Sequence, residues 1–365
     1  MSSGITWLVG GTVVTPSRLA QGSVAIRDGR IVEVRRSASV RGGKRLNVKG
    51  QYVAPGLIDL HVWGEPKRVS AQEAKTGTTA FLHAVGPESP QGLIGRLLQI
   101  EQQQAQCRGA ACLGLHLEGP FLNPLRAGAL ASRWLRPPTR RELHQLLEHA
   151  DGKLRLLTLA PEMPGGLETV DRFARRGIAV SLGHTDASAA LAQQAVELGA
   201  HLVTHAFNGM RAFHHRDPGL VGEALTNDRV SAMAILDGVH IDPYAFRLLV
   251  KCKGAERVIL TTDSIRHHHE EWGAKLVGGT YRLQSGTMAG SKLTMMQAVQ
   301  NAVAFGRVSL PEAVRMASLN PARAIGEEKR RGSIEVGKIA DLVVFDDQFR
   351  VSMTLVNGDI VYRKS

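Results

Sequence analysis

Residues 178–205 read IAVSLGHTDASAALAQQAVELGAHLVTH, and this stretch decides the fold. Two short apolar runs flank a segment rich in alanine and leucine, the kind of sequence that forms a helix. A strand, a helix and a second strand in this order form a βαβ unit, in which the two strands are parallel. The runs end at His184 and His205, so we expect both imidazoles at the same edge of a sheet.

Outward from this stretch, apolar runs recur along most of the chain, and most are followed by a helical pattern. Eight runs are found, most of them ending in His, Glu or Asp: 56–61, 78–83, 112–118, 154–159, 178–184, 201–205, 232–237 and 258–263. Eight βα units in about 210 residues predict a (β/α)8 barrel, whose catalytic groups lie at the carboxyl ends of the strands. A doubly wound open sheet is the alternative, but neither GxGxxG nor GxxxxGK[ST] follows a strand.

Both ends of the chain have a different character, with short strands separated by turns. The expected strands are 6–9, 12–15, 23–27, 30–35 and 45–48 near the start, and 342–345, 352–356 and 360–362 near the end. Neither set is large enough to bury a core alone. We therefore expect residues 1–52 and 330–365 to form one discontinuous β-sandwich domain, and residues 53–329 to form the barrel.

Composition and charge narrow the class of protein. The net charge of +12 favours anionic partners, but the basic residues are scattered and only 5% of residues are aromatic, which argues against nucleic-acid binding. No apolar run approaches the ~20 residues that span a bilayer, and the start lacks a secretory signal pattern, so no membrane partner is expected. Three cysteines form no CxxC pair, which favours a cytoplasmic protein.

Three strand ends predict a metal site. Glu118, His184 and His205 supply one carboxylate and two imidazoles from three different strands. One histidine alone is more often a core or surface residue, so the prediction rests on their shared position at the barrel mouth. Two histidines and one glutamate with an open fourth position form the ligand set of a catalytic zinc site. We expect one divalent ion, zinc in the first place, with Fe²⁺ or another divalent metal as the alternative.

Two further residues at strand ends complete the predicted site. Asp263 ends the eighth run, where its carboxylate can accept a proton from water and return it to a leaving amine; an aspartate there also suits a helix N-cap. His61 lies in Asp59-Leu-His-Val-Trp63, one residue short of a His-x-His pair. Because an indole cannot bind a metal ion, Trp63 favours one tight metal site, with His61 beside it as a neighbour that at least forms hydrogen bonds.

Several segments match a known family over essentially the whole chain. They are Val53-Ala-Pro-Gly-Leu-Ile-Asp-Leu-His61, Leu115-His-Leu-Glu-Gly-Pro-Phe-Leu-Asn123, Ser181-Leu-Gly-His-Thr-Asp-Ala187, Thr204-His-Ala-Phe-Asn-Gly-Met210, Asp237-Gly-Val-His240, Leu260-Thr-Thr-Asp-Ser264, Met288-Ala-Gly-Ser-Lys-Leu-Thr-Met295 and Asn320-Pro-Ala-Arg323. With them the chain resembles the N-acetylglucosamine-6-phosphate deacetylases of the amidohydrolase superfamily. Their fold, a (β/α)8 barrel with a β-sandwich from both termini, agrees with the prediction above.

The resemblance implies an activity and a role for each site residue. The activity is metal-dependent hydrolysis of the acetamide of N-acetylglucosamine 6-phosphate to glucosamine 6-phosphate and acetate, in amino-sugar catabolism. By position, Glu118, His184 and His205 hold the metal, and Asp263 is the general base and acid. Asn208, Arg216 and His240 bind the sugar phosphate, with Arg216 reaching across the interface of a homodimer.

Two positions depart from the family pattern, and Trp63 adds a third peculiarity. The family often has histidine where this chain has Leu130, after Gly128-Ala129, and its second strand usually ends in Leu-Pro-Thr where this chain places His83 near the mouth. The alternatives are therefore a deacylase of a related sugar, such as N-acetylgalactosamine 6-phosphate or an unphosphorylated compound, and a non-catalytic sugar-phosphate-binding relative. The run 267–269, three histidines, is more typical of a solvated or substrate-covering loop than of a metal site.

Overall fold

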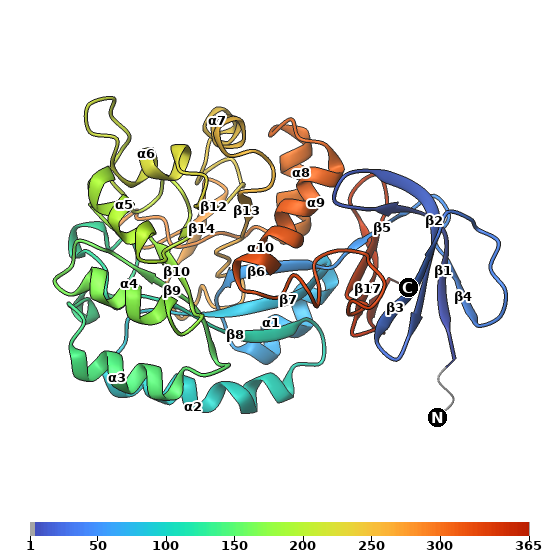
Figure 1. The fold of residues 1–365 in the computed structure, drawn as a ribbon, viewed down its shortest axis with the longest axis horizontal. Helices are drawn as coiled ribbons and strands as arrows, with labels where there is room; N and C mark the ends of the chain where they lie inside the picture. Colours follow the sequence, from blue (N-terminus) through green and yellow to red (C-terminus); the bar gives the residue numbers. More distant parts are fainter. Residues whose placement is uncertain (1–3, 365) are drawn as a thin grey trace.

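The computed structural model describes residues 4–364. Figure 1 shows two parts: a barrel of strands surrounded by helices, and a β domain beside it that contains both ends of the chain. In the described residues, no helix is long and apolar enough to cross a membrane.

The barrel is made of eight strands that pair in sequence order, β6 to β13, all parallel. Their bounds are β6 Leu57–Val62, β7 Thr78–Val85, β8 Ala111–Glu118, β9 Leu154–Leu159, β10 Ala179–Leu182, β11 Leu202–Val203, β12 Ser231–Ala234 and β13 Val258–Leu260. A parallel bridge from Val62 to Ser264 closes the ring, where the backbone N of Trp63 donates to the carbonyl of Ser264 at 3.0 Å. The predicted (β/α)8 barrel is confirmed.

Side chains fill the interior of the barrel. Buried apolar residues from its strands form one cluster there: Ile58, Leu60, Ala80, Leu82, Leu156, Ala179, Leu202, Met233 and Ile259. They alternate along each strand with residues that face the helices, because successive side chains of a strand point to opposite faces. A filled barrel leaves only its ends for a ligand, so the site lies where the strands end.

Helices cover the outside of the barrel. Those of the described residues are α1 Pro66–Glu73, α2 Pro90–Gln106, α3 Arg140–His149, α4 Gly166–Ala174, α5 Ala189–Glu197, α6 Gly219–Thr226, α7 Pro243–Lys253, α8 Met295–Ala304, α9 Leu310–Ala317 and α10 Leu319–Ala324, with short 3₁₀ turns at Ala74–Thr76, Pro124–Arg126 and Ser132–Trp134. Local signals set their starts. Asp242, for example, caps α7 by accepting a hydrogen bond from the backbone N of Tyr244 at 2.7 Å, and Pro243 follows as the first helical residue.

The β domain joins strands from both ends of the chain. Its sheet runs β18-β17-β16-β5-β1-β2-β3, with β4 paired to β1; the bounds are β1 Thr6–Val14, β2 Leu19–Arg27, β3 Arg30–Arg35, β4 Lys44–Asn47, β5 Tyr52–Pro55, β16 Leu342–Phe345, β17 Val351–Val356 and β18 Asp359–Arg363. The backbone N–H of Ile31 in β3 donates to the carbonyl of Lys338 at 2.9 Å, which joins the edge of the sheet to the segment before β16. Buried apolar residues from both ends of the chain form one core there. The exact domain boundaries at 52/53 and 329/330 stay a prediction.

One expected turn proves to be a bulge. We expected separate strands at 6–9 and 12–15, but β1 runs through both. The register with β2 shifts between Leu8 and Gly11, and Gly10 has a φ of +75°, a conformation open to glycine at little cost. The glycine pair therefore bends one strand instead of ending it.

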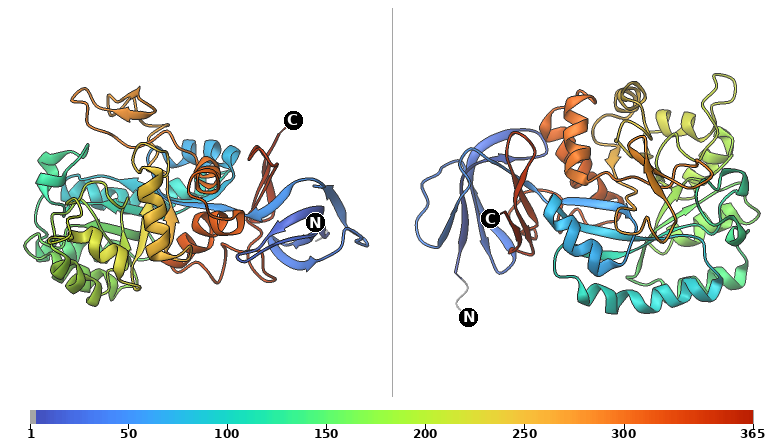
Figure 2. Two further views of the ribbon diagram at one scale, coloured as in Figure 1. Left: turned by 90° about the horizontal axis from the view of Figure 1, so that it is seen from above. Right: turned by 180° about the vertical axis from the view of Figure 1, so that it is seen from behind.

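A small hairpin stands apart from both parts. It is formed by β14 Lys275–Val277 and β15 Thr280–Arg282, and Figure 2 shows it projecting from the barrel. Tyr281 at its base packs into a buried apolar cluster with Trp63 and Leu130. The segment after β13 is thereby fastened to the mouth of the barrel.

Candidate metal centre and reaction cavity

The predicted metal ligands lie where three barrel strands end. Glu118 is the last residue of β8, while His184 and His205 each follow the end of their strand by two residues. Both histidines and Asp263 have positive φ angles, of 48°, 30° and 47°. This region costs a non-glycine residue about 1–3 kcal/mol, and such strain concentrates at functional sites. The chain thus turns sharply at the points where these side chains enter the mouth.

The three side chains converge on one small volume. The Oε1 atom of Glu118 lies 3.1 Å from Nε2 of His184 and 3.0 Å from Nε2 of His205, and the two Nε2 atoms are 3.1 Å apart. All three residues are buried, and they form a potential metal-ligating group in the described part of the chain. Burial raises the pKa of Glu118, but the imidazoles of His61 and His184 lower it by more. The pKa of Glu118 therefore lies well below its usual range.

The second nitrogen of each imidazole shows that the site fits a cation. Nδ1 of His184 lies 2.6 Å from the carbonyl of Arg126, and Nδ1 of His205 lies 3.1 Å from the carbonyl of Asn208. Because a carbonyl only accepts, each Nδ1 carries the proton in the neutral ring, and each Nε2 turns a lone pair toward Glu118. The two lone pairs and the carboxylate thus face one point, where a cation would fit. The hydrogen bonds from Nδ1 to backbone carbonyls are those that metal-bound histidines typically make with their other ring nitrogen.

Asp263 is joined to this group through His61. Nε2 of His61 lies 3.3 Å from Oε2 of Glu118 and 3.3 Å from Oδ1 of Asp263, with the ring fully buried. Burial lowers the pKa of His61, but the charges of Glu118 and Asp263 outweigh it and raise the pKa to about 9. Asp263 also accepts a hydrogen bond from Nε1 of Trp63 at 2.7 Å. Trp63 therefore contacts the proposed base directly, which the sequence did not reveal.

Asp59 is a second residue that sequence reasoning missed. Its buried carboxylate accepts hydrogen bonds from Oγ1 of Thr261 at 2.7 Å and from the backbone N of Thr262 at 3.2 Å. Burial nevertheless raises the pKa of Asp59 to about 6. These bonds tie β6 to the end of β13 at the seam of the barrel and so hold His61 against Asp263. The available signal was an aspartate inside an apolar strand.

A cavity of about 180 Å³ opens above these residues. It is lined by Glu118, His184, His205 and Asp263, and also by Asn208 and His240, together with apolar side chains of which Trp63, Leu130 and Trp272 form one wall. Nδ1 of His240 lies 2.7 Å from Oδ2 of Asp237, which orients its ring. Two of the three predicted phosphate-binding residues therefore share a cavity with the predicted metal ligands.

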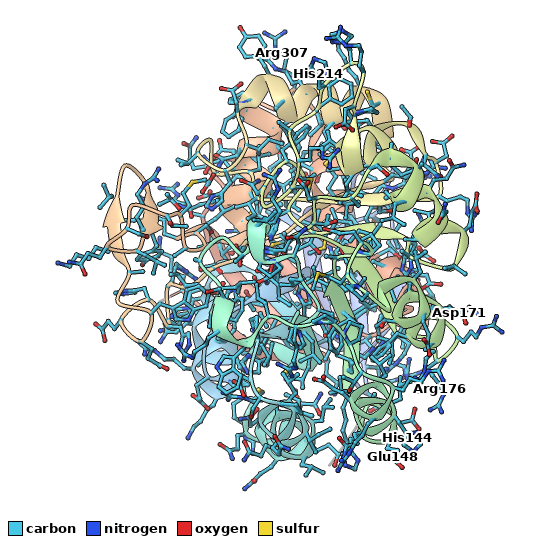
Figure 3. The ribbon with its side chains drawn as sticks, turned by 90° about the vertical axis from the view of Figure 1, so that its left-hand side faces the viewer. His144, Glu148, Asp171, Arg176, His214 and Arg307 are labelled. Atoms are coloured by element: carbon cyan, nitrogen blue, oxygen red, sulfur yellow. The ribbon has the colours of Figure 1, made fainter. Side chains whose placement is uncertain are left out.

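Arg216 lies outside this cavity. It sits on the exposed loop before α6, where its Nη1 is 2.8 Å from Nε2 of His215. Figure 3 shows the neighbouring His214 at the outer edge of the molecule. Within one copy of the described chain, Arg216 is not brought to the other predicted site residues.

The remaining histidines near the mouth have separate surroundings. His83 lines a second, larger cavity behind Trp63. In the run 267–269, His267 contacts the buried carboxylate of Glu73 at 3.0 Å, His268 lies 3.0 Å from Glu271, and His269 stacks on Tyr281. These contacts fasten the segment after β13 and leave the run outside the metal-ligating group of the described residues.

Comparison with known proteins shows the family to which the chain belongs. Residues 52–361 match the model of the Amidohydrolase family. The chain is 32% identical to the N-acetylglucosamine-6-phosphate deacetylase of Bacillus subtilis (strain 168), over 96% of this chain and 95% of that protein. It is also 32% identical to the human protein of that name, over 98% and 91%. An N-acetylgalactosamine-6-phosphate deacetylase of Escherichia coli O157:H7 is 32% identical over 85% and 88%.

Solved structures of proteins with the same name are similar to this one over the whole chain. N-acetyl-D-glucosamine-6-phosphate deacetylase of Mycobacterium smegmatis, a mutant in complex with N-acetyl-D-glucosamine-6-phosphate, has a TM-score of 0.90 at 30% identity, covering 99% of this chain and all of that one. The protein of that name from Pasteurella multocida gives 0.90 at 28%, with the same coverage. Over its whole length, the chain belongs to the N-acetylglucosamine-6-phosphate deacetylase family of the amidohydrolases.

Proposed function

We propose that the chain hydrolyses the acetamide of N-acetylglucosamine 6-phosphate, releasing acetate and glucosamine 6-phosphate. One observation carries the proposal: Glu118, His184 and His205 meet in a single group, and His61 links that group to Asp263 through two 3.3 Å contacts. Family membership supports the choice of substrate, because the relatives carry that name. A protein that only binds sugar phosphate has no need of the base beside the metal site.

Glu118, His184 and His205 would hold one divalent ion, and we propose zinc. When bound, a divalent ion at such a site polarises a carbonyl and lowers the pKa of water. The protein keeps the ligands oriented through the carbonyls of Arg126 and Asn208.

Asp263 would move the protons of the reaction. Its carboxylate takes a proton from the attacking water as the new C–O bond forms, then gives it to the amine as the C–N bond breaks. The products are acetic acid and the amine, which ionise to acetate and an ammonium group. Trp63 and His61 hold the carboxylate in place from two sides, at 2.7 and 3.3 Å.

Recognition of the phosphate would fall to Asn208 and His240 from the same copy and to Arg216 from a second copy. Arg216 is exposed on a loop that also exposes Phe213, so it is available to a partner. A planar guanidinium suits a phosphate because it donates two parallel hydrogen bonds. We therefore propose a homodimer, and a cytoplasmic location consistent with the free state of Cys107, Cys112 and Cys252.

Acetate release from a panel of substrates tests this function. The panel contains N-acetylglucosamine 6-phosphate, N-acetylgalactosamine 6-phosphate and both unphosphorylated sugars. We expect the highest kcat/KM for the first. A preference for the galactose epimer would move the chain toward the function of its Escherichia coli relative. No acetate from any of the four, with metal bound, would leave only a binding role.

A further inference from the structure

A second cavity of about 790 Å³ lies behind the wall of the reaction cavity. Its lining comes from β7, from α2 and from the segments after β6, β7, β8 and β13. Its polar side chains include His83, Arg96, Gln103, Arg133 and His268, and the acidic residues Glu65, Glu88 and Glu271. It is much larger than the reaction cavity, at about 180 Å³. The mechanism proposed above makes no use of it.

The second cavity lies on the far side of the reaction centre from the phosphate-binding residues. His83 belongs to β7, and Asn208 follows β11, four strands away in a ring of eight. In a 2-acetamido sugar 6-phosphate, C2 lies across the ring from C5, which carries the phosphorylated carbon. A substrate with its phosphate near Asn208 and its amide near Glu118 therefore directs its acyl group toward β7.

The wall between the cavities is apolar and shared. Trp63, Leu130 and Trp272 line both cavities. Trp63 is held by its bond to Asp263, and Trp272 meets it edge-on with ring centroids 4.9 Å apart. Trp272 is only half-buried, whereas Trp63 and Leu130 are buried. An alkyl chain that leaves the amide along this side meets indole and leucine surfaces before it reaches polar groups.

His83 lines the second cavity with a ring that has one unpartnered nitrogen. The side chain is 7% exposed, and its Nδ1 is buried without a hydrogen-bond partner among the described residues. Burial, with the charges of Arg96 and His268, lowers the pKa of His83 to about 3, so the ring is neutral and can both donate and accept. Because Nδ1 is shielded, a ligand hydroxyl in the cavity would bond to the other ring nitrogen, Nε2.

The charges around the second cavity favour a neutral ligand group over an anionic one. Arg96 is paired with Glu88 at 2.6 Å, and His268 lies 3.0 Å from Glu271. Because Arg96 and His268 already face carboxylates, and Glu65 adds a third acidic side chain to a lining whose remaining basic group is Arg133, a hydroxyl suits the cavity better than a further carboxylate.

We propose that the second cavity binds the far end of an N-acyl group longer than acetyl, with a hydroxyl bonded to His83. The substrate class is then N-acyl amino sugar 6-phosphates with short hydroxyacyl chains. The proposal rests on the proposed function and keeps its chemistry: water adds to the acyl carbon, the C–N bond breaks, the acyl group leaves as a carboxylate and the amine takes the proton.

Release of amine from three glucosamine 6-phosphate derivatives tests the proposal: N-acetyl, N-butyryl and N-(3-hydroxybutyryl). We expect the hydroxybutyryl compound to match the acetyl one in kcat/KM within about tenfold and to exceed the butyryl one, since a site built for a hydroxyl discriminates against its absence. Hydrolysis of the acetyl compound alone, with the others at least about a hundredfold slower, overturns the proposal and leaves the proposed function standing. No hydrolysis of any compound contradicts the proposed function instead.

Variants that change only the second cavity sharpen the test. Gln103→Trp fills it from the surface of α2, and Gln102→Trp places the same ring on an exposed neighbour outside it. We expect Gln103→Trp to reduce kcat/KM for the hydroxybutyryl compound at least about tenfold and to leave acetyl hydrolysis within about twofold, with Gln102→Trp unchanged. His83→Phe should remove the preference for the hydroxyl while acetyl hydrolysis persists. Equal effects on both substrates, in protein with unchanged Tm, would contradict the proposal.

Discussion

The two sides of the barrel mouth differ in how their polar atoms are satisfied. On the side of β8, β10 and β11, both Nδ1 atoms of His184 and His205 have carbonyl partners, and their Nε2 atoms face Glu118. On the side of β6 and β7, Trp63 and Leu130 form an apolar wall, and Nδ1 of His83 is buried without a partner in residues 4–364. The first side therefore directs its polar atoms at one point, while the second side leaves a buried nitrogen without a partner among the described residues.

This difference separates the chemistry from the choice of substrate. A metal site tolerates little change because each ligand needs a set orientation. On the other side, the indole of Trp63 holds Asp263 through one N–H. The departures from the family pattern, at Trp63, His83 and Leu130, all line the second cavity, whereas Glu118, His184 and His205 keep the pattern.

The largest expected effect comes from a change on the side of β8, β10 and β11. Glu118→Gln should lower the bound metal to a small fraction of one equivalent, because the group with His184 and His205 loses its carboxylate, and should reduce turnover by at least about a thousandfold. Metal analysis beside acetate release checks this. Glu148→Gln, an exposed residue of α3 labelled in Figure 3, serves as the control. Retained metal and turnover in the Glu118 variant would place the site elsewhere.

A smaller loss is expected at the phosphate end of the same side. Arg216→Ala should reduce kcat/KM for the phosphorylated sugar by about ten- to a hundredfold, since a charge-assisted hydrogen bond contributes about 1.5–3 kcal/mol. The unphosphorylated sugar should be little affected. Mixing Arg216→Ala with Asp263→Asn protein should restore activity, because a mixed dimer holds one site with both residues. Equal loss on both sugars would remove the phosphate role.

On the wall side, Trp63→Phe tests whether the indole serves the base. Losing the 2.7 Å hydrogen bond to Asp263 should lower kcat about tenfold with little change in KM, because the carboxylate loses an orienting donor and the substrate loses no partner. Trp134→Phe, at an exposed site, is the control. A rise in KM with kcat unchanged would assign Trp63 to substrate binding alone.

A further expected effect concerns the pH dependence of stability and leaves turnover aside. Burial holds the pKa of His83 at about 3, against 6.5 in an unfolded chain. Between these values the unfolded chain binds the proton and the folded one does not, so stability falls as pH decreases through this window, by about 2 kcal/mol at pH 5. Urea unfolding at pH 7.5 and pH 5 checks this. Between these pH values, the free energy of unfolding of His83→Gln should fall by about 2 kcal/mol less than that of the wild type. An identical drop in both proteins would mean that His83 is protonated when folded.

Most of the fold could be predicted from the chain because its signals are local. Each barrel strand is a short apolar run, and helices such as α7 carry their own caps. The turn expected after Val9 was wrong because a pair of glycines also permits a bulge, and only pairing with β2 decides between them. The group of Glu118, His184 and His205 was predictable for a similar reason, since each residue stands at or just after the end of its own strand.

The residues that were missed act through contacts between distant segments. Asp59 bonds to Thr261 and Thr262, and Trp63 bonds to Asp263, each about 200 residues away along the chain. The same limit applies to His83, which could be placed near the mouth but not assigned to a cavity of its own. Periodicity and spacing describe one strand at a time, whereas these partners meet only when β13 closes against β6.

The most direct test of the whole account is acetate release by Asp263→Asn protein whose metal content is measured in the same sample. Asparagine keeps the size of the side chain and can still accept from Trp63, but it cannot take a proton from water. We expect about one equivalent of metal, as in the wild type, and a loss of turnover of several orders of magnitude. Near-normal acetate release with metal bound would contradict the central claim, because the proton would then move through a group other than Asp263.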